Sequence, residues 1–81
     1  MKKIFLLEDD FSLNETIKDM LNKSGFVVDS FYSGEKAFEN ILGEYALYIL
    51  DINVPNIDGI TILEKIKSIS QNSKVIIISA N

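Results

Sequence analysis

The sequence has 81 residues, enough for one small domain, and 47% of them are hydrophobic, so a real core is possible. Its formal net charge is −4, which argues against binding of a nucleic-acid backbone by this segment. All eight basic residues are lysines and there is no Arg, His or Cys, which excludes histidine bases, cysteine nucleophiles, thiolate or imidazole metal sites and disulfides.

The chain begins with an apolar run that predicts a buried strand over residues 4–7. Three acids, Glu8, Asp9 and Asp10, follow it directly. Ser12 and Glu15 then have the spacing of a capping box, which predicts the start of a helix that stops at Ser24-Gly25. Its expected buried face consists of Leu13, Ile17, Met20 and Leu21.

The next two predicted elements are shorter. Residues 26–31 indicate a strand, and its polar interruption at Asp29-Ser30 is typical of the edge of a sheet. Ser33-Gly34 is expected to open a second helix that ends at Gly43. The apolar face predicted for this helix consists of Ala37, Phe38, Ile41 and Leu42.

The second half of the chain repeats the pattern. Residues 46–50 predict a central strand that leads into Asp51 and a loop containing Pro and Gly. Asp58 is a good N-cap for a third helix, and residues 74–78 predict a fourth strand. The apolar face expected on the third helix consists of Ile62, Leu63, Ile66 and Ile69.

Alternating strands and helices of this size predict a doubly wound α/β fold over residues 1–81, with a parallel sheet and helices on both faces. In the flavodoxin-like strand order 2-1-3-4, the first and third strands are neighbours and their carboxyl ends meet at a switch point.

The carboxyl ends of the predicted strands bring together a set of oxygen-bearing groups. Glu8 and Asp9 follow the first strand, Asp51 and Asn53 the third, and Ser79 the fourth. Carboxylates this close repel each other unless a proton or a cation lies between them, and a site made only of oxygens suits Mg²⁺ or Mn²⁺. A metal-bound, exposed Asp could attack phosphorus as a nucleophile.

Each of these features also has a simpler interpretation when it is taken alone. Asp51 could cap a turn, the first acidic cluster could be the solvated N-terminus of a helix, and Ser79 could belong to a turn. The combination of all three at one edge of a sheet is much harder to obtain by chance.

The combined pattern resembles the receiver domain of response regulators in two-component signalling. The matching segments are 4–9 (IFLLED), Asp51 with 53–59 (NVPNIDG), and 75–80 (VIIISA), in the order and approximate spacing of the family. The resemblance extends over essentially the whole chain.

The resemblance implies a role for each matching residue. Asp51 matches the phosphoacceptor, which takes a phosphoryl group from a histidine kinase or a phosphotransfer protein. Glu8 and Asp9 match the acidic pair that binds Mg²⁺, and Asn53 matches the residue whose main-chain carbonyl is a further ligand. Ser79 matches the switch hydroxyl. The acceptor would act stoichiometrically, so we do not expect an enzyme.

The chain departs from the family pattern in one respect. A complete receiver domain continues through a final α-β-α unit, and its fifth strand ends in a lysine that pairs with the phosphoryl group. None of the eight lysines here has that position, since Lys74 begins a strand, so we expect this segment to be impaired in phosphoryl transfer. Two alternatives remain open: a Mg²⁺-dependent aspartyl-phosphate phosphohydrolase, and an interaction domain that is never phosphorylated.

The remaining expectations concern cellular location and assembly. The lack of cysteines, of a signal peptide and of a membrane-length apolar run predicts a cytoplasmic protein that does not bind membranes. Without the final unit, the first and third strands would be bare on one face, and either Ile76 and Ile78 or Val75 and Ile77 would face solvent. We therefore expect this segment to form a homodimer or a larger assembly.

Overall fold

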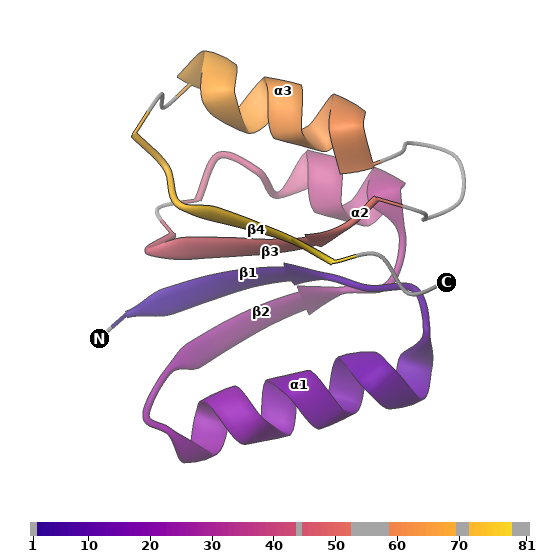
Figure 1. Cartoon of the computed structure of the whole chain (residues 1–81), viewed down its shortest axis with the longest axis vertical. Coiled ribbons are helices and arrows are strands. Elements are labelled where there is room, and N and C mark those ends of the chain that lie inside the picture. Colours follow the sequence, from indigo (N-terminus) through magenta and orange to yellow (C-terminus); the bar gives the residue numbers. More distant parts are fainter. Residues whose placement is uncertain (1, 44, 53–58, 70–71, 79–81) are drawn as a thin grey trace.

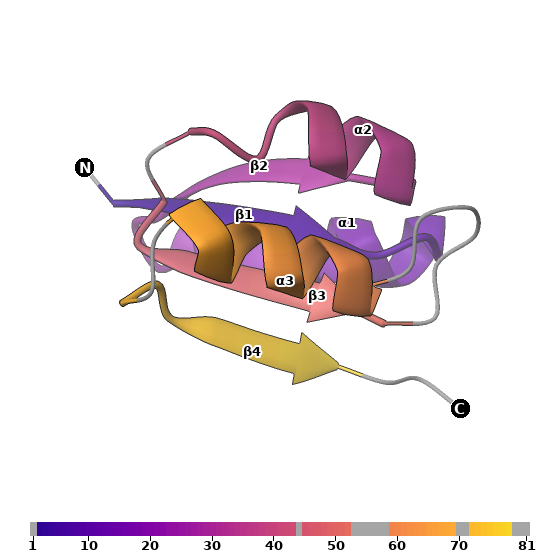
Figure 2. The same ribbon diagram turned by 90° about the horizontal axis from the view of Figure 1, so that it is seen from above.

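The computed structural model describes residues 2–43, 45–52, 59–69 and 72–78. Its centre is a parallel sheet of four strands: β1 (Lys3–Leu7), β2 (Val27–Phe31), β3 (Leu47–Asp51) and β4 (Val75–Ile78). Figure 2 shows them side by side in the order β2-β1-β3-β4, with β2 at one edge as predicted. The doubly wound α/β prediction is therefore confirmed.

In the described part of the chain, three helices cover the two faces of the sheet. Helix α1 (Phe11–Lys23) lies against one face, and α2 (Gly34–Glu39) and α3 (Gly59–Ile69) lie against the other (Figure 1). None of the helices in the described part of the chain is long and apolar enough to cross a membrane.

Strand β1 contributes to a separate core on each face, because alternate side chains of a strand point in opposite directions. Phe5 and Leu7 belong to the cluster beneath α2 and α3, and Ile4 and Leu6 belong to the cluster beneath α1. All four side chains are buried, which explains why this strand appears in the sequence as an uninterrupted apolar run.

Helix α1 starts earlier than the predicted capping box. Asp10, and not Ser12, is its N-cap: the Asp10 carboxylate accepts a hydrogen bond of 3.0 Å from the backbone N–H of Leu13. Ile17 and Leu21 pack against the core as expected. Leu13 and Met20 do not, since they are 36% and 60% exposed, and assigning them to the buried face was wrong.

Helices α2 and α3 also bury fewer apolar side chains than predicted. Helix α2 has the expected N-cap, Ser33, but ends at Glu39 with Asn40 as its C-cap, well before Gly43. Leu42 therefore lies outside the helix and is 75% exposed, contrary to the prediction. In α3, Ile62 and Ile66 are buried but Ile69 in the last turn is 44% exposed. The predicted cap Asp58 lies outside the described residues.

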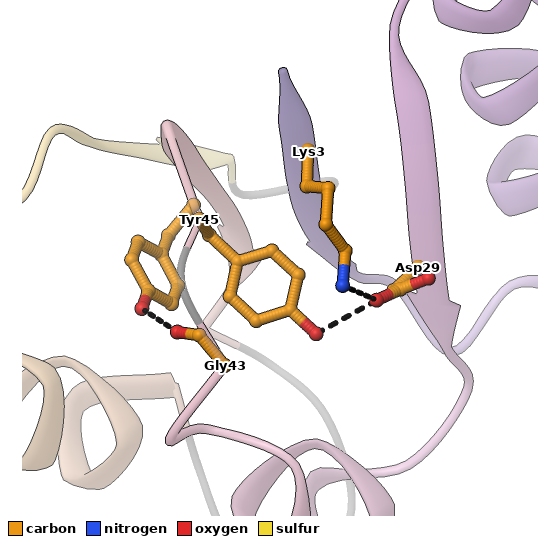
Figure 3. Close-up of polar contacts among 5 residues, drawn as sticks. Lys3, Asp29, Gly43 and Tyr45 are labelled. Carbon is orange, nitrogen blue, oxygen red and sulfur yellow. Dashed lines mark hydrogen bonds and ion pairs between the residues drawn. The ribbon is translucent and has the colours of Figure 1, made fainter. Parts of the chain in front are cut away.

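Tyr45, just before β3, packs against the core cluster beneath α2 and α3, and its hydroxyl points toward Asp29 of β2 (Figure 3). Its ring packs edge-on against Phe5 with centroids 5.2 Å apart, and its hydroxyl donates a hydrogen bond of 2.8 Å to Asp29. The Lys3 ammonium lies 3.4 Å from the same carboxylate oxygen. Burial and the Asp29 carboxylate raise the pKa of Tyr45 to about 12, so the hydroxyl keeps its proton and remains a donor.

Candidate functional site

The register of the sheet brings two acidic residues side by side at its carboxyl edge. Leu7 of β1 pairs with Leu50 of β3, so the next residues along each strand, Glu8 and Asp51, lie at the same level. Asp9 follows as the chain turns toward α1. Glu8, Asp9 and Asp51 each offer a carboxylate oxygen, and these oxygens all lie within 4.8 Å of one another. The predicted convergence of these three acids is present in the structure.

The three carboxylates differ in their surroundings. Glu8 and Asp51 are almost completely buried, with 1% and 3% of their surface exposed, whereas Asp9 is exposed. Burial, together with the nearby charge of Asp51, raises the pKa of Glu8 to about 7, although a hydrogen bond from the Asp10 backbone N–H opposes the shift. That bond, to Glu8 Oε2, is 2.9 Å long.

The donor set fits a hard divalent cation. Among the described residues, the buried Glu8 Oε1 has no hydrogen-bond partner, and a cation would offset its charge as well as that of Asp51. All the available ligand atoms are carboxylate oxygens, which Mg²⁺ and Mn²⁺ accept and which suit Zn²⁺ or Cu²⁺ less well. Glu8, Asp9 and Asp51 are the residues that would hold the ion.

Two of the predicted site residues, Asn53 and Ser79, lie outside the described residues, as does Pro55 in the loop. Lys74 is where the sequence predicted it. Its carbonyl accepts a hydrogen bond from the backbone N–H of Tyr48 at the beginning of β3, which is the edge opposite to Asp51.

Asn14 is not among the predicted site residues, although it is completely buried and contacts the backbone of Glu8. Its side-chain amide donates hydrogen bonds to the backbone carbonyls of Glu8 at 2.9 Å and Phe31 at 3.0 Å. One signal was available: positions 14, 17 and 21 have helical spacing, and an Asn at a core position of a helix requires a partner.

The chain is similar to known proteins and to solved structures. The family model for the response regulator receiver domain matches residues 4–81. The transcriptional regulatory protein CssR of Bacillus subtilis (strain 168) is 39% identical over 77 residues, which are 95% of this chain and 34% of that protein. The chain therefore spans about a third of the length of several curated relatives that it matches.

Two solved structures match nearly the whole chain. One is the response regulator TrrA from Thermotoga maritima in complex with Mg²⁺-BeF, with a TM-score of 0.91 and 32% identity, covering 100% of this chain and 71% of that one. The other is the complex of the histidine kinase ThkA with TrrA, with a TM-score of 0.89 and 32% identity, covering 99% of this chain and 70% of that one. Together with the family model, these similarities show that the chain belongs to the response regulator receiver domain family.

Proposed function

We propose that the chain is a phosphoacceptor module in which Asp51 receives a phosphoryl group from a phosphohistidine, with Mg²⁺ or Mn²⁺ bound by Glu8, Asp9 and Asp51. The observation that carries the proposal is the convergence of these three carboxylates at the carboxyl edge of the sheet. The similarity to TrrA, which was solved in complex with Mg²⁺-BeF, supports the choice of ion.

In the proposed transfer, a carboxylate oxygen of Asp51 forms a bond to phosphorus while the bond from phosphorus to the donor imidazole nitrogen breaks. The product is an acyl phosphate on Asp51, and the imidazole gains a proton from solvent. The bound cation supplies electrostatic stabilisation of charge on the transferring group. Glu8 and Asp9 would hold the ion, and the family resemblance assigns the role of a further main-chain ligand to Asn53 and that of the switch hydroxyl to Ser79, both of which lie outside the described residues.

The proposal makes the protein a stoichiometric acceptor, not an enzyme with turnover. At most it would phosphorylate and dephosphorylate itself. Its partner would be a sensor histidine kinase or a phosphotransfer protein, an assignment supported by the solved complex of the similar protein TrrA with a histidine kinase. A partner of that kind implies a cytoplasmic protein, and the net charge of −4 argues against nucleic-acid binding by this segment.

The test measures labelling by a small acyl phosphate or phosphoramidate with intact-mass spectrometry. The 81-residue polypeptide is labelled beside any longer product of the same gene. We expect one phosphoryl group per chain in the presence of Mg²⁺, loss of labelling in Asp51→Asn, and retention in Asp19→Asn, which makes the same chemical change at an exposed ion pair on α1. Labelling of Asp51→Asn to the same extent as the parent protein would contradict the proposal.

Labelling is expected to be weaker in the 81-residue polypeptide than in a longer product that contains a suitable lysine. The reason is that hydrogen bonds between a charged amine and phosphoryl oxygens are among the strong ones. Equal labelling of the two proteins would show that such a lysine is dispensable.

A further inference from the structure

Asn14 is a polar residue at a position where the packing of α1 would accept a hydrophobic one. It lies on the buried side of the helix with Ile17 and Leu21, and no part of it is exposed. Its amide does not bond within α1. Instead, it donates to the carbonyl of Glu8, just beyond β1, and to that of Phe31, the last residue of β2.

These hydrogen bonds connect α1 to the carboxyl ends of β1 and β2. The Phe31 carbonyl also accepts a hydrogen bond of 3.1 Å from the backbone N–H of Glu8, so one oxygen holds both the end of β1 and the side chain of Asn14. On the outer surface, the Tyr32 hydroxyl donates to Glu15, and the Tyr32 ring stacks on Phe11 with centroids 5.5 Å apart. The first turns of α1 are thus joined to the end of β2 from inside and outside.

The Glu8 carbonyl that Asn14 contacts lies where the chain leaves the sheet after β1. The Glu8 carbonyl belongs to the peptide group that joins Glu8 to Asp9, so the orientation of this group sets the direction in which both carboxylates leave the backbone. A hydrophobic side chain of similar size could fill the same volume, but it could not donate to this carbonyl.

We propose that Asn14 is a positioning residue for the acidic site, which fixes the Glu8–Asp9 peptide so that the two carboxylates meet that of Asp51. The inference rests on the proposed function, because it assumes that the three carboxylates bind a divalent cation. Asn14 itself is not a ligand, and it acts only through the backbone of the acidic pair.

The test uses Asn14→Leu, which removes the amide and keeps a similar volume. Mg²⁺ is titrated while the amide resonances of residues 7–10 are followed by NMR, under conditions where every protein is folded. Mutation of a residue that orients metal ligands typically lowers metal affinity by about ten- to hundredfold. We expect Asn14→Leu to lower the affinity for Mg²⁺ by a factor in that range. The resonances of Asp9 and Asp10 are also expected to shift before any metal is added, because the peptide group has moved.

The matched control is Leu21→Ala, which weakens the packing of the same helix against the same core cluster. It should lower the midpoint of thermal unfolding and leave Mg²⁺ affinity unchanged. A second variant, Asn14→Gln, retains an amide donor on a longer side chain. Its Mg²⁺ affinity should lie between those of the parent and a variant without the amide.

The outcomes separate the two proposals. If the parent protein bound no Mg²⁺ at millimolar concentration, the metal site itself would be disproved, and with it this inference. If the parent bound Mg²⁺ and the Asn14 variants bound it equally well, or if Leu21→Ala weakened binding as much as they did, the positioning role alone would be overturned.

Discussion

The fold disfavours the ionised form of the Glu8 carboxyl group. Its pKa is raised from the ordinary 4.5 to about 7, mainly by burial and further by Asp51. The folded protein therefore holds this proton more tightly than the unfolded chain does. It follows that Glu8 makes the protein less stable as the pH rises from about 4.5 to about 7, and that the full loss persists at higher pH.

We accordingly predict that Glu8→Gln stabilises the protein above pH 7, by at most about 3 kcal/mol, and has little effect below pH 4.5. Thermal unfolding as a function of pH measures this, in buffer without divalent ions. The control is Glu39→Gln, which removes an exposed carboxylate from α2 and should show no comparable dependence. A Glu8→Gln variant that is less stable than the parent at pH 8 would show that the buried charge is compensated.

The acidic residues of the site could be predicted from the sequence, and the helical spacing of positions 14, 17 and 21 indicates that Asn14 is buried, but the partner of its amide could not be predicted. Glu8 and Asp51 directly follow apolar runs, and the ends of neighbouring parallel strands meet at one edge, so local pattern and topology together suffice. The role of Asn14 depends on the carbonyl of Phe31, which is 17 positions away in the chain. No local spacing indicates a contact of that kind.

At the level of elements, the strands were easier to predict than the faces of the helices. Strands β1, β3 and β4 are apolar runs beside a turn, whereas the buried face of a helix depends on where the helix starts. Asp10 and Ser12 are both good N-caps in sequence terms, and in the structure Asp10 takes the role by accepting a hydrogen bond from the backbone N–H of Leu13. The buried face is therefore centred on Asn14, Ile17 and Leu21, which leaves Leu13 and Met20 exposed.

Helix α3 approaches β3 so closely at Gly59 that the position requires a residue without a side chain. A Cβ atom there would lie 2.5 Å from the Cα of Ile52 and 2.7 Å from the carbonyl oxygen of Asp51. Both atoms belong to the backbone and cannot rotate away. This contact gives a structural reason for the glycine in the motif that follows Asp51.

Gly59→Ala is expected to destabilise the protein by about 1–3 kcal/mol, the usual cost of overpacking, and to shift the amide resonance of Asp51. Chemical denaturation and NMR measure the two effects. Gly25→Ala is the comparison: Gly25 has a φ of 95° and nothing within 4 Å of its added Cβ, so this variant should lose stability through backbone strain and leave Asp51 unperturbed. Equal NMR shifts at Asp51 in both variants would argue against a local contact.

On the scale of the whole molecule, the exposed apolar surface is distributed differently from the prediction. The first and third strands were expected to be bare on one face, but Ile4 is 2% exposed and Ile49 is 9% exposed on the α1 side, so that part of the prediction was wrong. On β4, Ile76 and Ile77 are 48% and 41% exposed, which is neither of the two expected pairs. Ile76 lies beside Ile49 and Ile77 beside Leu50, so the two point to opposite faces of the sheet.

We therefore expect copies of the polypeptide to contact each other through β4. It is an edge strand that pairs, within the described residues, only with β3, and it presents an isoleucine on each face. Unpaired strand edges with apolar side chains favour association with another chain. The 81-residue polypeptide should therefore have a mass above its 9.1 kDa monomer that rises with concentration in the micromolar range, as measured by light scattering.

Two lysine substitutions test whether β4 is the contact. Ile76→Lys places a charge on the edge strand and should shift the polypeptide toward the monomer. Leu42→Lys makes a similar change at a side chain that is 75% exposed in the α2–β3 connection, and it should leave the assembly intact. A parent polypeptide that stays monomeric at 9.1 kDa and unfolds cooperatively would contradict the prediction, because its exposed isoleucines would then be tolerated in water without a partner.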